Sequence, residues 1–118
     1  MRVRVPRKKV REKFLLIYEL EGCQKAVNYL TRYYGIRKMN IIVDGRKVMR
    51  TRTHKIYSAH YYRNKAYFTK RGLTKRLLLH ERYHHLVYVN GLDITKTREE
   101  RAANNYARDF LNWYSLGR

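Results

Sequence analysis

Residues 77–84 of the chain read Leu77-Leu78-Leu79-His80-Glu81-Arg82-Tyr83-His84. An H-E-x-x-H pattern follows a short apolar run here, and residues four apart lie on one face of a helix, a turn from each other. His80 and His84 can therefore hold one zinc ion between them, while the Glu81 carboxylate can reach a water bound to that ion. The pattern predicts a zinc site with Glu81 as catalytic base, an arrangement typical of zinc-dependent peptidases.

The residues that flank this motif predict where its helix begins and ends. Thr74 follows Gly72 and is a suitable N-cap, because its hydroxyl can accept a backbone N–H of the first turn. The helix should run to about Val89, since Asn90-Gly91 is a turn signal.

A catalytic zinc needs a third protein ligand and an open position for water. No histidine follows His85, so we look for an oxygen ligand among the acidic residues downstream, which are Asp93, Glu99, Glu100 and Asp109. Residues 97–111 have helical periodicity, with Ala103 and Ala107 on the inward face. Glu100 shares that face, whereas Glu99 is turned by ~100° and should look outward. Glu100 is therefore the predicted third ligand.

The second of these helices also resembles a known family. Residues 100–107 read Glu100-Arg101-Ala102-Ala103-Asn104-Asn105-Tyr106-Ala107, similar to the E-x-x-A-(N/D)-x-(F/Y)-A glutamate helix of gluzincin peptidases. With the H-E-x-x-H helix the resemblance covers residues 57–111, and it is nearest to the ImmA/IrrE type and the small archaeal minigluzincins. It implies a zinc metalloendopeptidase that acts on a peptide or protein, with Asn104 hydrogen-bonded to a zinc-binding histidine. Three residues depart from the family pattern: Arg82, Tyr83 and His85.

Helical periodicity before the motif completes the expected α+β architecture of a single domain, residues 1–118. Two apolar stripes within residues 8–34 predict an N-terminal helix or helical hairpin that ends at Gly35. This part should act as a structural wall for the sheet.

Four short segments predict a small, mostly antiparallel sheet. Residues 39–43 form a candidate strand, and the following Asp-Gly pair predicts a hairpin turn into a second strand at 47–53. Residues 56–62 and 65–69 form a further strand pair, joined by Arg63-Asn64.

The family resemblance assigns a task to this sheet. In gluzincin-like folds the strand before the zinc helix borders the substrate cleft, so residues 65–69 would be the edge strand that binds an extended peptide. His54 and His60 are the remaining histidines. A lone histidine near a strand is more often a surface or core group, but one of these two could stabilise the oxyanion.

Cysteine usage and hydropathy indicate the compartment. Cys23 is the single cysteine, which rules out a disulfide within the chain and fits a reducing environment. No apolar run approaches the ~18 residues that span a membrane, and Glu19 and Glu21 cut short the apolar stretch at 14–18. We expect a cytoplasmic protein with no membrane association.

The charge balance points to a further class of partner. The net charge is +19, and twelve tyrosines are interspersed among the cations. A nucleic acid or other polyanion would suit this composition, although a self-repelling soluble surface or attraction of an acidic protein substrate would also explain it. The alternative to a peptidase is thus a basic nucleic-acid-binding module or a regulatory protein with a non-catalytic zinc site. The basic residues form a dense N-terminal arm, residues 1–9 and beyond: Arg2, Arg4, Arg7, Lys8, Lys9, Arg11 and Lys13.

The C-terminal tail, residues 112–118, is unusually apolar, with Trp113, Tyr114 and Leu116. These residues could dock on the domain's own core and finish the glutamate helix. Alternatively, an extended tail could lie in the active-site cleft and restrain the enzyme, as the likeness to zymogen-like minigluzincins implies.

Overall fold

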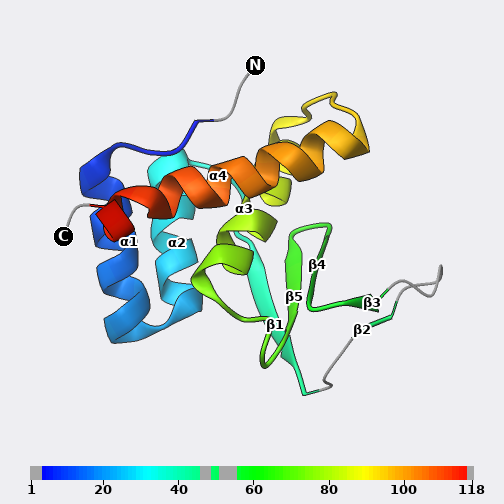
Figure 1. Cartoon of the computed structure of the whole chain (residues 1–118), viewed down its shortest axis with the longest axis horizontal. Coiled ribbons are helices and arrows are strands. Elements are labelled where there is room, and N and C mark those ends of the chain that lie inside the picture. Colours follow the sequence, from blue (N-terminus) through cyan, green and yellow to red (C-terminus); the bar gives the residue numbers. More distant parts are fainter. Residues whose placement is uncertain (1–3, 46–48, 51–55, 117–118) are drawn as a thin grey trace.

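The computed structural model describes residues 4–45, 49–50 and 56–116, and Figure 1 shows their arrangement. It has the expected α+β composition, with helices at both ends of the chain and a small mixed sheet between them. The elements, in chain order, are α1 (Lys8–Glu21), α2 (Cys23–Tyr34), β1 (Asn40–Asp44), β2 (Met49–Arg50), β3 (Ile56–Tyr57), β4 (Ala59–Tyr62), β5 (Lys65–Thr69), α3 (Lys75–Asn90) and α4 (Lys96–Leu116).

The N-terminal segment is a helical hairpin, one of the two predicted forms. Gly22 separates α1 from α2 with a φ of +97°, a conformation that residues with a side chain rarely adopt. Phe14 and Leu30 are fully buried on the facing sides of the two helices. Gly35 ends α2 in the left-handed conformation, as predicted for its C-cap.

The three-stranded sheet has the order β1-β5-β4, which corrects one predicted pairing. β1 was expected to turn back through a hairpin into residues 47–53, but it pairs in parallel with β5, Asn40 opposite Lys65. In the described part of that second segment, β2 pairs with β3 in a separate antiparallel ladder, and residues 51–53 lie outside the described residues. The side-chain amide of Gln24 helps to place β1 beside β5, because it donates to Met39 O at 3.0 Å and accepts from Ile41 N at 2.8 Å. These bonds tie β1 to α2.

The predicted hairpin between β4 and β5 is confirmed. Arg63 and Asn64 have φ values of +41° and +68°, as a two-residue hairpin turn requires. The expectation that 65–69 forms the sheet edge is wrong, because β5 lies between its two neighbours and β4 takes the edge. A central position suits the composition of β5, whose Ala66 and Phe68 are fully buried beneath the helices.

Helix α3 begins and ends where the sequence predicted. The Thr74 hydroxyl accepts the backbone N–H of Leu77, and Gly91 closes the helix in the left-handed conformation. Gly72 fixes the approach to the helix, because a Cβ there would lie 2.1 Å from the carbonyl oxygen of Ser58. The close contact between this loop and the chain before β4 thus needs a glycine.

Helix α4 crosses α3 and continues beyond the predicted glutamate helix. Ala103 and Ala107 are fully buried, and small residues of this kind allow close packing against α3. Further along, the ring of Phe110 meets Phe14 of α1 edge-to-face at 5.2 Å between centroids. The contact links the two ends of the chain in one core.

The C-terminal residues take the first of their two expected forms. Residues 112–116 continue α4 to Leu116 and do not form an extended tail. In Figure 1 this end of α4 lies near α1. With 1.5 Å of rise per residue, Leu116 lies about 24 Å along the axis from Glu100. Finishing the helix is therefore the form that these residues take.

The N-terminal basic arm also differs in part from its predicted extent, because α1 already begins at Lys8. Within the described ranges, no helix is both long and apolar enough to cross a membrane.

Candidate metal centre

The three predicted metal ligands meet between α3 and α4. His80 Nε2 lies 3.1 Å from one oxygen of Glu100, and His84 Nε2 lies 3.1 Å from the other. The two histidine nitrogens are 3.2 Å apart. These three side chains thus form a compact triangle, in which each histidine lies nearest a different oxygen of Glu100. Two nitrogens that each lie ~2.0–2.1 Å from one tetrahedral zinc are about 3.3 Å apart, so the 3.2 Å between the histidine nitrogens suits two ligands of one zinc ion.

The remaining nitrogen of each histidine has its own acceptor on α4. Asn104 Oδ1 lies 2.9 Å from His80 Nδ1, the contact that the family resemblance implied. Glu99 Oε2 lies 2.5 Å from His84 Nδ1, so the prediction that Glu99 looks outward is wrong. The directions of Glu99 and Glu100 were both predicted from the helical periodicity of α4 alone. In the structure α4 passes over α3 in such a way that both carboxylates reach His84.

These partners determine where the histidine protons lie and show that the site fits a cation. In the tautomer that carries its proton on Nδ1, each histidine donates to its acceptor on α4 and presents the Nε2 lone pair toward Glu100, which is the form that binds a metal. Two lone pairs and a carboxylate then converge with no proton between them. Such a group of acceptors is stable when a metal ion lies among them. The three residues are also the group of potential metal ligands found within the described residues.

Glu81 lies beside this triangle, with its Oε1 4.0 Å from His84 Nε2. Its side chain is almost entirely buried. Burial, and secondly the nearby carboxylate of Glu100, raise the pKa of Glu81 to about 8. Burial also lowers the pKa of His80, with the neighbouring His84 as the second cause, and this favours the neutral form that binds metals. The site therefore holds a carboxyl of raised pKa next to an imidazole of lowered pKa.

A cleft of about 350 Å³ opens over the metal ligands and is bordered on its other side by β4. Tyr57, His60 and Tyr61 contribute to its walls. His60 is one of the two histidines considered for a role at the oxyanion, and His54 lies outside the described residues. Burial lowers the pKa of His60, with electrostatic repulsion by His84 as the second cause, and this favours the neutral form of His60.

The hydroxyl of Tyr61 is fully occupied and is not free for a substrate. His85 Nε2 lies 2.7 Å from the carbonyl oxygen of Arg37, so this nitrogen donates and Nδ1 accepts. Tyr61 donates to that Nδ1 at 2.7 Å and accepts the backbone N–H of Asn64 at 2.9 Å. Burial lowers the pKa of His85 to about 4, which keeps it neutral in this chain of bonds. The chain joins α3 to the β4–β5 hairpin.

The other departures from the family pattern lie in the core. Arg82 is fully buried and donates from Nη1 to Thr31 Oγ1 at 3.1 Å, while its guanidinium faces the Tyr34 ring at 5.9 Å. Tyr83 is buried against Tyr106 of α4. Arg82, Tyr83 and His85 therefore attach α3 to its surroundings, and none of the three lines the cleft.

A second hollow of about 570 Å³ continues from the first and shares Tyr61, His84 and Glu99 with it. Its own lining is largely apolar and aromatic, with Tyr88 of α3 and Leu92 of the following loop.

The basic residues of the N-terminus do not gather into one site. Lys8 pairs with Glu12 at 3.7 Å, Lys13 lies over the Tyr29 ring at 5.3 Å, and Arg11 bonds the backbone of α4. Arg4 lines a different hollow beside Tyr83, and Arg2 lies outside the described residues. The predicted polyanion-binding arm remains a hypothesis.

Comparison of the chain with protein-family models, with curated proteins and with solved structures gives no match. The gluzincin resemblance accordingly stays a hypothesis that rests on the two helical motifs.

Proposed function

We propose that this protein is a zinc-dependent peptidase of the gluzincin type. The observation that carries the proposal is the convergence of His80, His84 and Glu100 on one point, with a buried carboxyl beside them. The open cleft over these ligands supports catalysis, because structural zinc sites are closed by a fourth protein ligand, most often cysteine.

Glu81 has the central role in the proposed reaction. A bound zinc ion would supply a Lewis acid that activates water and polarises the scissile carbonyl. The Glu81 carboxylate accepts a proton from the attacking water and delivers it to the leaving amine. Its position supports this role, since Glu81 adjoins the ligands without belonging to the triangle.

Glu99 and Asn104 act as positioning residues. Each accepts the Nδ1 proton of one histidine, which fixes the tautomer and turns both Nε2 atoms toward the metal position. Without these acceptors either ring could rotate or bind a proton on the wrong nitrogen.

The free edge of β4 is the proposed binding strand for an extended peptide, in place of the central β5. Ser58 O accepts the Thr69 N–H at 3.0 Å, and hydrogen-bonded pairs alternate along an antiparallel ladder. The backbone groups of Ala59 and Tyr61 therefore point away from β5, and both residues line the cleft. A substrate strand can add to these groups, with specificity supplied by the hollows beside them.

His60 is the proposed stabiliser of the oxyanion. It lines the same cleft as the ligands, and the hydroxyl of Tyr61, the neighbouring candidate, is already committed to His85 and Asn64.

The decisive experiment compares zinc content and hydrolysis in the same preparations. The full chain, loaded with one zinc per molecule, should cleave an unfolded protein substrate. Glu81→Gln should retain the zinc and lower the rate by about 10²–10⁴-fold, because an amide cannot accept the proton. Glu12→Gln is the matched control, since Glu12 lies on the surface of α1, where it pairs with Lys8.

Two results would reject the proposal. One is a zinc-loaded wild-type chain that cleaves none of a broad set of unfolded proteins and peptides. The other is a Glu81→Gln variant that cleaves as fast as Glu12→Gln.

A further inference from the structure

The outer face of the three-stranded sheet presents aromatic and cationic side chains in two ordered rows. Side chains alternate between the faces of a strand, and residues opposite each other in neighbouring strands share a face. Ala59, Ala66 and Phe68 are buried against the helices. The residues between them must therefore occupy the opposite face. By the strand register, one row of this sheet face contains Asn40, Lys65 and Tyr62, and the other contains Ile42, Tyr67 and His60.

The rings on this sheet face are held in place but partly open. His60 and Tyr67 lie opposite each other with their rings stacked, 26° between planes and 6.4 Å between centroids. Tyr57 extends the series, with its ring 5.7 Å from His60. Tyr62 is 55 % exposed, and the Arg63 guanidinium lies over its ring at 5.2 Å. By the strand register Tyr62 of β4 is the diagonal neighbour of Tyr67 of β5, a relation that places Cα atoms about 7–8 Å apart.

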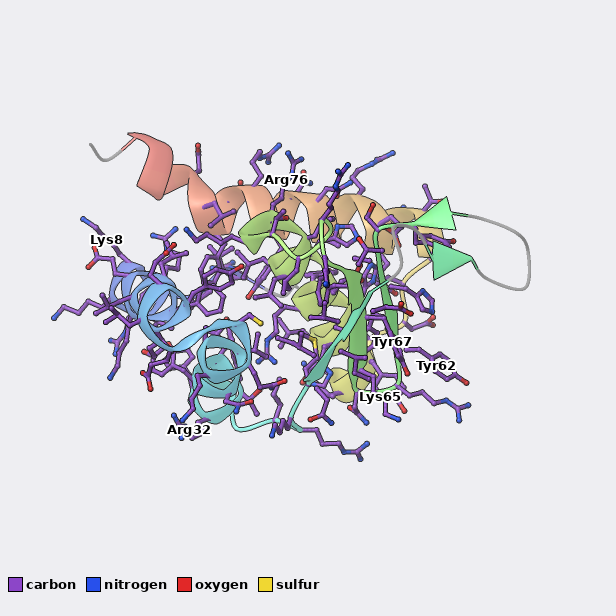
Figure 2. All side chains as sticks on the ribbon, turned by 90° about the horizontal axis from the view of Figure 1, so that it is seen from below. Lys8, Arg32, Tyr62, Lys65, Tyr67 and Arg76 are labelled. Atoms are coloured by element: carbon purple, nitrogen blue, oxygen red, sulfur yellow. The ribbon has the colours of Figure 1, made fainter. Side chains whose placement is uncertain are left out.

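No helix of the described ranges packs against this sheet face. In Figure 1 helices α1, α2 and α3 lie together on the other side of the sheet. Figure 2 labels Tyr62, Lys65 and Tyr67 at β4 and β5, on the side away from α1 and α2. The exposed ring of Tyr62 and the half-buried ring of Tyr67 are a surface that a partner can contact.

The charge around the sheet face is one-sided. Between Glu21 and Glu81 the sequence contains a single acidic residue, Asp44, at the end of β1. The same stretch contributes Arg63 and Lys65 at the hairpin, and Lys70 and Arg71 directly after β5, all exposed. A partner of this sheet face therefore carries negative charge.

We propose that the outer sheet face binds single-stranded nucleic acid, with bases stacked on Tyr62 and Tyr67 and phosphates paired with the surrounding lysines and arginines. Each ring offers its face to any base, and the cations supply the sequence-independent attraction to the backbone. A duplex has its bases stacked internally and cannot use the rings. An acidic peptide would use the cations but has no planar bases for the tyrosines. The combination of both features favours a single strand.

The proposed nucleic-acid site lies beside the metal cleft, because Tyr62 lines the neighbouring hollow, whereas Tyr67 lines neither the metal cleft nor that hollow. From the sequence the polyanion contact was expected on the N-terminal arm, whereas this proposal places it on the sheet.

The test measures fluorescence anisotropy of labelled oligo(dT) and oligo(U) with the full chain at one fixed salt concentration. Tyr62→Ala and Tyr67→Ala should each weaken binding roughly 5- to 100-fold, the range that loss of one base–aromatic stack produces. Tyr33→Ala is the matched control, because Tyr33 is 45 % exposed on α2, off the sheet. Lys65→Ala should weaken binding more than Lys25→Ala, which removes an exposed lysine of α2. The two oligonucleotides distinguish DNA from RNA as the preferred strand.

Unlabelled competitors separate this proposal from general attraction to anions. An unlabelled single strand should displace the probe, whereas an equal-length duplex or poly-glutamate should displace it only at much higher concentration. The proposal is overturned if duplex or poly-glutamate competes equally well. It is also overturned if folded Tyr62→Ala and Tyr67→Ala bind as tightly as Tyr33→Ala, and Tyr62, being the more exposed ring, keeps that comparison valid should Tyr67→Ala unfold.

Discussion

Glu99→Ala should weaken zinc binding by about 10- to 100-fold, although Glu99 is not a ligand. Its carboxylate lies 2.5 Å from His84 Nδ1 and holds the ring with Nε2 toward the metal position. Loss of such an outer partner typically costs 10- to 100-fold in metal affinity, which corresponds to about 1.4–2.8 kcal/mol. The side chain is 24 % exposed, so part of its charge is screened by water and the lower half of that range is expected. Glu99→Gln keeps an acceptor oxygen and should therefore lose less zinc affinity than Glu99→Ala.

The assay is a zinc titration against a chromophoric chelator at one fixed pH, with circular dichroism to verify folding. Asp109→Ala is the control, because Asp109 also lies on α4 and its half-exposed carboxylate contacts Arg108 and none of the ligands. Glu100→Ala should bind zinc more weakly than Glu99→Ala, since it removes a proposed ligand. The reasoning fails if Glu99→Ala binds zinc as tightly as Asp109→Ala, or if it binds more weakly than Glu100→Ala.

Three further predictions concern stability. Gly72→Ala should lower the free energy of unfolding by ~1–3 kcal/mol in urea titrations, since its Cβ would lie 2.1 Å from a backbone oxygen, while Gly45→Ala, with nothing within 4 Å, should change it little. Phe110→Ala should cost ~3–5 kcal/mol by the same measurement, because the ring is fully buried; a loss below ~1 kcal/mol would contradict the described core. Zinc at 100 times its dissociation constant should stabilise the wild type by ~2.7 kcal/mol in thermal melts and should leave His80→Ala unchanged.

Local signals in the sequence predicted the two helices of the site. Thr74 and Gly91 determine the ends of α3 through their own backbone and side-chain chemistry, so no distant contact was needed. The phase of α4 was likewise readable from Ala103 and Ala107, which must face the core. Glu100 followed from that phase and meets the histidines as expected.

The errors arose where the outcome depends on residues far apart in the chain. An Asp-Gly pair after β1 favours a hairpin locally, but β1 gains a longer ladder with β5 and two hydrogen bonds from Gln24. The direction of Glu99 was judged from a helix alone, whereas its contact depends on how α4 crosses α3. Neither the ladder nor the crossing has a signature within a short window of sequence.

The pairing of α3 with α4 determines how readily the proposed metal site could be transferred to another protein. His80, Glu81 and His84 come from α3, and the partners of the histidines all come from α4, with only residues 91–95 between the two helices. All ligands, the base and the positioning acceptors thus belong to one continuous segment of two antiparallel helices. A designer could transplant that segment onto another sheet, and an evolving protein could exchange α1 and α2 while keeping the metal. Altering the length of the 91–95 connection would have the opposite effect, because it would slide one half of the centre past the other.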